Sequence, residues 1–150
     1  MAMIFNDLSD VQREYGAEHG IRLFYADKGL VMQMADTVLF DLGRADIRPD
    51  AAPLIDRVAE AVKDAPHGVR IEGHTDAIPT DPQGQWETNW ELSTARATNV
   101  LHYLVDFGVS EEQFQVAGFA DTVPLASNET EEGRAYNRRV DIVILSEGHL

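Results

Sequence analysis

Two short extended segments separated by a long amphipathic helix constrain this chain more than any other pattern in its sequence. The first segment, 69–72, reads Val-Arg-Ile-Glu, and the second is predicted at 115–119. Apolar residues recur between them at helical spacing: Ala97, Val100, Leu101, Leu104 and Val105. A strand, a helix and a further strand require a crossover connection, which packs helices on one face of a sheet. We therefore predict an α+β fold, a sandwich of a mixed β-sheet covered by helices.

A helix and a strand pair are predicted before this unit. The helix is marked by apolar residues that recur on one helical face: Ile4, Leu8, Val11 and Tyr15. Two extended runs follow at 21–26 and 30–35, joined by a tight turn in which Gly29 suits a positive φ. Apolar residues alternate with other types in the second run, which predicts a strand with one buried face.

The remaining segments complete the order of elements. Residues 37–48 are predicted as a loop, and a helix with one apolar face follows Pro49. The spacing of Ser110-Glu111-Glu112-Gln113 is that of a capping box, which predicts one short helical turn. A polar loop with a short helix is predicted at 128–136, before a last strand at 140–145. The sequence shows no internal repeat and no linker.

The excess of acidic side chains excludes two classes of partner. The sequence has 26 Asp and Glu residues against 12 Lys and Arg residues, a formal net charge of −14. Nucleic acids and anionic lipids both attract Lys and Arg, so we expect neither as a partner. The absence of Cys excludes disulfides and Cys-based zinc sites. No apolar run reaches the roughly 18–20 residues of a membrane helix, so any membrane anchor is expected outside this sequence.

A polar motif, Gly73-His74-Thr75-Asp76, follows the predicted strand at 69–72. Loops at strand ends often bind ligands, and this one offers a hydroxyl and a carboxylate. The alternative is that Thr75 and Asp76 only satisfy loop amides, as a turn or a cap. No second histidine lies at ligand spacing from His74, so we expect no metal site.

Two further segments place arginines where a ligand can use them. Asn89 is predicted to cap the helix that contains Arg96, and Leu92 lies one turn before Arg96 on the same face. Arg96 and Asp76 can pair with each other, or hold the two ends of a zwitterionic ligand. Asn137-Arg138-Arg139 precedes the last strand, so one arginine should point to each face of the sheet. Surface ion pairs are the alternative for these arginines.

Enzymatic motifs are missing from the sequence. It contains no G-x-S-x-G, no P-loop and no glycine-rich dinucleotide turn. Nothing pairs a carboxylic acid of raised pKa with a second carboxylate, as glycoside hydrolysis requires. We therefore expect no enzyme, no catalytic residue and no cofactor.

Three motifs in this order resemble those of the OmpA-like peptidoglycan-binding domain. They are I-E-G-H-T-D at 71–76, N-x-x-L-S-x-x-R-A at 89–97 and G-R-A-Y-N-R-R-V at 133–140. The segment 38–49 also looks like the family, and the resemblance covers residues from about 36 to 145. It implies the OmpA-like α/β sandwich over 36–150, preceded by a helix and strand lead-in at 1–35.

Within this family the chain looks most like stator B subunits of the flagellar motor, MotB or its sodium-driven counterpart. The resemblance lies in the long segment between Asp76 and Asn89, in the start of the following helix, and in the N-terminal lead-in. It implies the periplasmic domain of an inner-membrane protein, which anchors a stator to the cell wall without catalysis. A homodimer is expected, with a MotA-type subunit as partner through a membrane segment absent from this sequence. The alternatives are a wall anchor of another envelope system and, as a different class, an envelope hydrolase.

The resemblance also assigns roles to individual residues. In the family, the Asp of G-H-T-D and the Arg of L-S-x-x-R-A hold the diaminopimelate of the peptide stem. These positions are Asp76 and Arg96 in this sequence. Four residues match neighbouring motif positions, and they complete the predicted peptidoglycan-binding site: Thr75, Asn89, Leu92 and Arg138.

Overall fold

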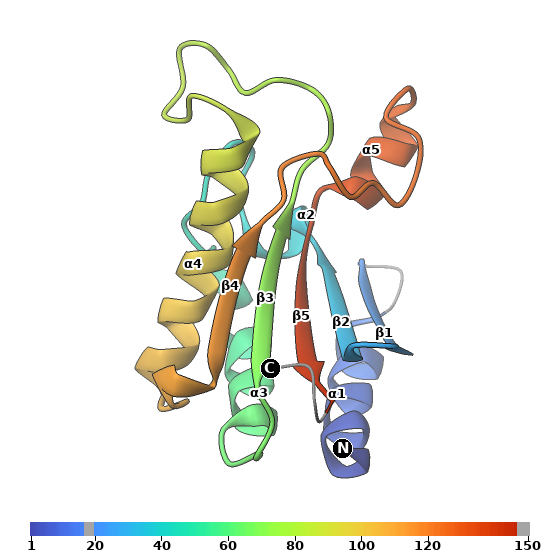
Figure 1. The fold of residues 1–150 in the computed structure, drawn as a ribbon, viewed down its shortest axis with the longest axis vertical. Coiled ribbons are helices and arrows are strands. Elements are labelled where there is room, and N and C mark those ends of the chain that lie inside the picture. Colours follow the sequence, from blue (N-terminus) through green and yellow to red (C-terminus); the bar gives the residue numbers. More distant parts are fainter. Residues whose placement is uncertain (17–19, 147–150) are drawn as a thin grey trace.

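Five strands form a single mixed sheet in the computed structural model, which describes residues 1–16 and 20–146 (Figure 1). The strands lie in the order β1-β2-β5-β3-β4. The β3–β4 pair is parallel and the other pairs are antiparallel. Their bounds are β1 (Ile21–Ala26), β2 (Gly29–Ala35), β3 (Val69–His74), β4 (Phe114–Gly118) and β5 (Arg139–Leu145). The predicted α+β architecture is confirmed.

Three helices cover one face of this sheet, as the crossover requires (Figure 1). They are α1 (Ala2–Tyr15), α3 (Ala52–Val62) and α4 (Asn89–Phe107). Two shorter helices, α2 (Asp36–Leu39) and α5 (Glu131–Asn137), lie near the end of the sheet where β3 terminates. Single 3-10 turns precede α3 and β4, at Pro49–Ala51 and Glu111–Gln113. No helix within 1–16 and 20–146 combines the length and the apolar character needed to span a membrane.

The main core lies between the helices and the sheet. Alternate residues of the two central strands β2 and β5 point into it, among them Met32 and Ile142, which are fully buried. From the other side come Leu8 of α1, Leu54 of α3 and other apolar side chains at helical spacing. The N-terminal helix and strand pair share this core and this sheet with the rest of the chain.

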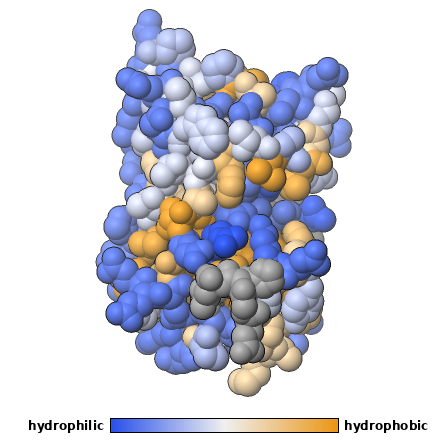
Figure 2. Space-filling model, viewed as in Figure 1, coloured by the Kyte–Doolittle hydropathy of each residue, from blue (hydrophilic) through white to orange (hydrophobic). Residues whose placement is uncertain are grey.

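The second face of the sheet is also partly buried, which the sequence pattern does not predict. Val31, Val143 and Leu145 form a small cluster there with Phe24 packed against it, and β2 is therefore buried on both faces. The prediction of one buried face for β2 is wrong because strands β1 and β5 bring their own apolar residues beside Val31. Outside the grey residues, this face shows both hydrophilic and hydrophobic patches (Figure 2).

Several local predictions also need correction. Residues 36–39 form the short helix α2 inside a segment predicted as a loop. Thr88, and not Asn89, caps α4: its hydroxyl accepts from the Trp90 amide, and Glu91 completes a capping box. The turn at 111–113 is present, but Ser110 makes no capping bond. There the Gln113 amide instead donates to three carbonyl oxygens, those of Val62, Ala65 and His67.

Candidate functional site

The predicted site residues meet at the end of the sheet where β3 terminates. Asp76 follows β3, Arg96 lies two turns into α4, and Arg138 joins α5 to β5. The backbone amide of Asp36, the first residue of α2, donates to the Arg138 carbonyl oxygen at 2.9 Å. Four segments that are distant in sequence therefore supply charged side chains to one place.

Asp76 and Arg138 form the central ion pair of this site. Oδ2 of Asp76 accepts from Nη1 of Arg138 at 2.8 Å. Oδ1 of Asp76 accepts from the Ile78 amide at 3.0 Å, which fixes the carboxylate orientation. Arg138 also donates to Glu131 at 2.7 Å. Partial burial opposes the charge of Arg138, but the bonds to Asp76 and Glu131 outweigh it and raise the pKa of the guanidinium.

Arg96 pairs with Asp36 and not with Asp76. Its Nη1 lies 3.3 Å from Oδ2 of Asp36, its Nε donates to the Arg44 carbonyl oxygen at 2.7 Å, and its guanidinium lies over the Phe40 ring. Burial lowers the pKa of Arg96, and the Asp36 carboxylate opposes that shift. Burial likewise raises the pKa of Asp36, against the effects of Arg96 and Arg138. The direct Arg96–Asp76 pair considered from the sequence is not formed.

Asp36 connects the two ion pairs into one network. Its Oδ2 also lies 3.7 Å from Nε of Arg138, so the order is Arg96, Asp36, Arg138, Asp76. Sequence reasoning missed Asp36 because it belongs to none of the three motifs. The available signal was an Asp directly after an apolar strand, in the segment that begins the resemblance.

Thr75, Asn89 and Leu92 lie beside this network. The Thr75 hydroxyl donates to the Asp76 carbonyl oxygen at 2.9 Å, and the Asn89 amide donates to the same oxygen at 3.3 Å. Asn89 also donates to the Ile78 carbonyl oxygen, so it holds the loop after Asp76 against the start of α4. Leu92 is buried one turn before Arg96. All six predicted residues therefore lie in one region of the fold, although only three of them, Asp76, Arg96 and Arg138, belong to the charged network.

The network is mostly buried but has one accessible edge. The side chains of Arg96, Asp76 and Asp36 are 5%, 10% and 11% exposed, whereas that of Arg138 is 23% exposed. Ile78 and Trp90 are exposed apolar residues on the neighbouring loop and helix start. A ligand that carries both an ammonium and a carboxylate can exchange with these internal pairs, because each protein charge would keep a partner of opposite sign.

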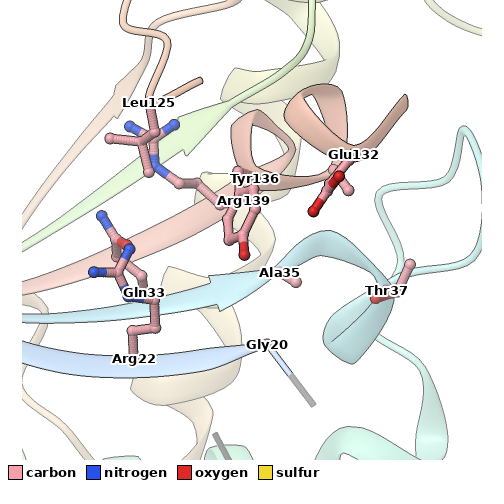
Figure 3. A pocket seen from close by; sticks show the side chains of 10 residues that line it. Gly20, Arg22, Gln33, Ala35, Thr37, Leu125, Glu132, Tyr136 and Arg139 are labelled. Carbon is pink, nitrogen blue, oxygen red and sulfur yellow. The ribbon is translucent and has the colours of Figure 1, made fainter. Parts of the chain in front are cut away.

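A cavity of about 640 Å³ lies next to the network, between α5 and the β1–β2 edge (Figure 3). Figure 3 shows Arg22 and Gln33 on its sheet side and Tyr136 and Glu132 on α5. None of the six predicted residues lines it. Arg139 lines the cavity, whereas Arg138 pairs with Asp76. The two side chains diverge, but only Arg139 belongs to β5, so the prediction of one arginine on each face of the sheet is wrong for Arg138.

Comparison with known proteins decides the relationship of this chain. The model of the OmpA family matches residues 39–138. The chain belongs to the OmpA family. The match contains all six predicted site residues and ends at the last of them, Arg138. Asp36 lies just before the start of the matched region.

Individual relatives extend this OmpA-family relationship beyond the matched region. Motility protein B of Bacillus subtilis is 35% identical over 133 residues, which are 87% of this chain and 51% of the relative. The chain thus spans about half the length of this curated relative.

Two solved structures share the fold. The cell wall anchor of the T6SS from Pseudomonas aeruginosa has a TM-score of 0.84 and 31% identity, covering 96% of this chain and 97% of that one. The periplasmic domain of Helicobacter pylori MotB has a TM-score of 0.79 and 26% identity, covering 86% and 83%. The similarity therefore includes the N-terminal helix and strand pair as well as the family core.

Proposed function

We propose that this OmpA-family chain is a non-catalytic peptidoglycan-binding domain that holds the diaminopimelate of the peptide stem. The observation that carries the proposal is the network Arg96–Asp36–Arg138–Asp76, in which two guanidiniums and two carboxylates converge at one end of the sheet. Diaminopimelate presents both ammonium and carboxylate groups. A carboxylate of this network can accept from its ammonium, while a guanidinium donates to its carboxylate.

The individual roles follow from the positions of the side chains. Asp76 is oriented by the Ile78 amide and would receive the ammonium group, in exchange for Arg138. Arg138, released at the accessible edge, and Arg96 would bind the carboxylate. Thr75 and Asn89 would act as positioning residues, since both donate to the Asp76 carbonyl oxygen. Leu92 would support the base of the site.

For the biological context we propose the anchoring of a flagellar motor stator to the cell wall. The relationship to motility protein B and to a MotB periplasmic domain supports this role. We further propose that the chain acts in the periplasm as a homodimer, as part of an inner-membrane protein with a MotA-type partner, and that residues 1–35 form a lead-in to the domain over 36–150. Sedimentation of the purified chain tests the dimer.

A wall anchor of another envelope system is the second candidate. The similarity to the T6SS cell wall anchor, which extends over nearly the whole of both chains, favours it. Complementation separates the two: the full-length gene should restore swimming to a motB deletion strain if the stator role is correct. A full-length protein without an N-terminal membrane helix bearing an Asp would contradict that role.

Sedimentation with purified sacculi tests wall binding itself. Asp76→Asn keeps an acceptor for the Ile78 amide but removes the charge, so we expect it to lose at least about tenfold in affinity. Asp81→Asn is the matched control, because exposed Asp81 accepts from the amide two residues ahead in the same way but lies outside the network. An equal loss of affinity in both variants, or no loss in either, would contradict the assignment.

The same incubation tests the hydrolase alternative. Release of soluble muropeptides by the wild-type chain would contradict a non-catalytic function. Arg96→Lys supplies a second test of the site, since it keeps the charge but loses the planar guanidinium. Circular dichroism must show that each variant is folded, because Arg96 also bonds the Arg44 carbonyl oxygen.

A further inference from the structure

A second cluster of ionisable side chains lies on the face of the sheet that the helices leave uncovered. Glu72 of β3 and Asp141 of β5 are cross-strand partners, and His74 lies two residues beyond Glu72 on the same face. None of the three is more than 4% exposed. Each offers a potential metal ligand, and these donor atoms lie within 4.8 Å of one another. The proposed wall-binding network uses none of them.

The His74 imidazole is not satisfied by the protein around it. Its Nε2 lies 3.5 Å from Oε1 of Glu72 and 3.6 Å from Oδ2 of Asp141. Neither ring nitrogen has a hydrogen-bond partner among residues 1–16 and 20–146. The buried Oδ1 of Asp141 also has no partner among these residues. The Phe119 ring stacks on the imidazole and holds its plane. Buried polar atoms almost always have partners, so three such atoms in one cluster point to a ligand.

We propose that Glu72, His74 and Asp141 form a Zn²⁺ site. Bonds of about 2.0–2.2 Å to nitrogen and oxygen place the ligands of a tetrahedral Zn²⁺ roughly 3.3–3.6 Å apart. The two separations from His74 Nε2, 3.5 and 3.6 Å, match this spacing. Mg²⁺ and Ca²⁺ prefer six or more oxygen ligands, which a set of one imidazole and two carboxylates does not offer.

Neighbouring cations set the affinity of this site. Nζ of Lys28 lies 3.0 Å from Glu72, and Nε of Arg139 lies 3.3 Å from Asp141. Arg70 lies 3.7 Å from Glu72. The Lys28 side chain is 38% exposed and can turn to solvent when an ion binds, whereas Arg139 is buried and would remain on Asp141 as an outer partner. Lys28 is therefore a competitor of the ion.

The three proposed ligands come from two segments that are distant in the sequence. The sequence predicts no metal site because no second histidine lies near His74, but Asp141 reaches the cluster from the last strand. His74 is two residues before Asp76, so a bound ion would brace the end of β3 next to the wall-binding network. The proposal does not depend on wall binding.

Competition of the whole chain with a chromophoric chelator for Zn²⁺ alone, followed by thermal unfolding, tests the proposal. We expect one Zn²⁺ per chain, a raised Tm with Zn²⁺ and no rise with Mg²⁺. His74→Gln should lose at least about tenfold in affinity. His102→Gln, which alters an exposed histidine of α4, should retain wild-type affinity.

Lys28→Gln supplies a test that removes no ligand. It should bind Zn²⁺ several-fold more tightly than the wild type, because the competing ammonium is gone. Absence of zinc binding in the wild type, unchanged affinity in folded His74→Gln, or unchanged or weaker affinity in Lys28→Gln would overturn the proposal. If His74→Gln does not fold by circular dichroism, the Lys28→Gln result decides alone.

Discussion

At the scale of single residues, the buried Asp36 makes the stability of the chain depend on pH. Burial raises the pKa of its carboxyl above the ordinary 3.8, although Arg96 and Arg138 oppose the shift. A carboxyl with a higher pKa in the folded chain binds its proton more tightly when folded. Its contribution to the free energy of unfolding is therefore complete below about 3.8 and is lost as the pH rises through the raised value.

Replacement of Asp36 should remove that contribution. As the pH increases from about 4 to 7, we expect the free energy of unfolding to fall less, or to rise more, in Asp36→Asn than in the wild type. Urea unfolding at a series of pH values measures the difference, with Asp81→Asn as an exposed control. If the free energy of unfolding varied with pH in parallel for Asp36→Asn and the wild type, Asp36 would have the same pKa in the folded and unfolded states, which would contradict this account.

The same residue shows the limit of sequence reasoning about the site. Asp76, Arg96 and Arg138 belong to the motifs that carry the family resemblance, and that resemblance is what places them in one site. Asp36 joins them only because Ala35 pairs with Arg139 in the β2–β5 register. That register depends on long-range pairing, which local patterns do not contain.

At the scale of elements, the start of α4 is secured by its capping box. The Thr88 hydroxyl accepts from the Trp90 amide and the Glu91 carboxylate accepts from the Thr88 amide. Asn89 is therefore free to hold the loop after Asp76. We expect Thr88→Ala to lower the free energy of unfolding by about 1 kcal/mol and to weaken sacculus binding. Thr98→Ala, within the same helix, should leave binding unchanged. Wild-type affinity of Thr88→Ala for sacculi would show that the cap does not support the binding site.

The contact between α4 and β3 depends on a glycine. A Cβ at Gly73 would lie 2.1 Å from the Ser93 carbonyl oxygen, so Gly73→Ala must displace the helix from the strand. We expect a loss of about 3 kcal/mol, measured by urea unfolding. A Cβ at Gly43 would have no atom within 4 Å. Gly43→Ala should therefore lower the free energy of unfolding only by the cost of a side chain at φ +68, about 1 kcal/mol. Equal losses in both would contradict this account of the packing.

Elements differ in how far their sequences predict them. The apolar stripes of α3 and α4 predict both helices, because many residues repeat the same spacing. The helix α2 has only four residues, too few for a periodic pattern, and it forms where Asp36 bonds the end of α5. The sequence predicts the cap of α4 one residue late, at Asn89, because Thr88 and Asn89 are both good capping residues.

At the scale of the whole molecule, the sheet positions the site and the three large helices leave its second face open. The strand–helix–strand pattern predicts that helices cover one face of the sheet. It does not predict that Val143 and Leu145 meet Val31 on the other face, since that contact requires the strand order β2-β5. The Glu72–His74–Asp141 cluster is likewise hidden from sequence reasoning, since it requires the pairing of β3 with β5.

The central claim is that the charged network selects diaminopimelate. The most direct measurement is calorimetric titration of the wild-type chain with two muropeptides that differ only in the third residue of the stem, diaminopimelate or lysine. Lysine lacks the carboxylate that the guanidiniums would bind. We predict binding of the diaminopimelate muropeptide and at least about tenfold weaker binding of the lysine one. Equal affinity for the two, or no binding of either, would contradict the account.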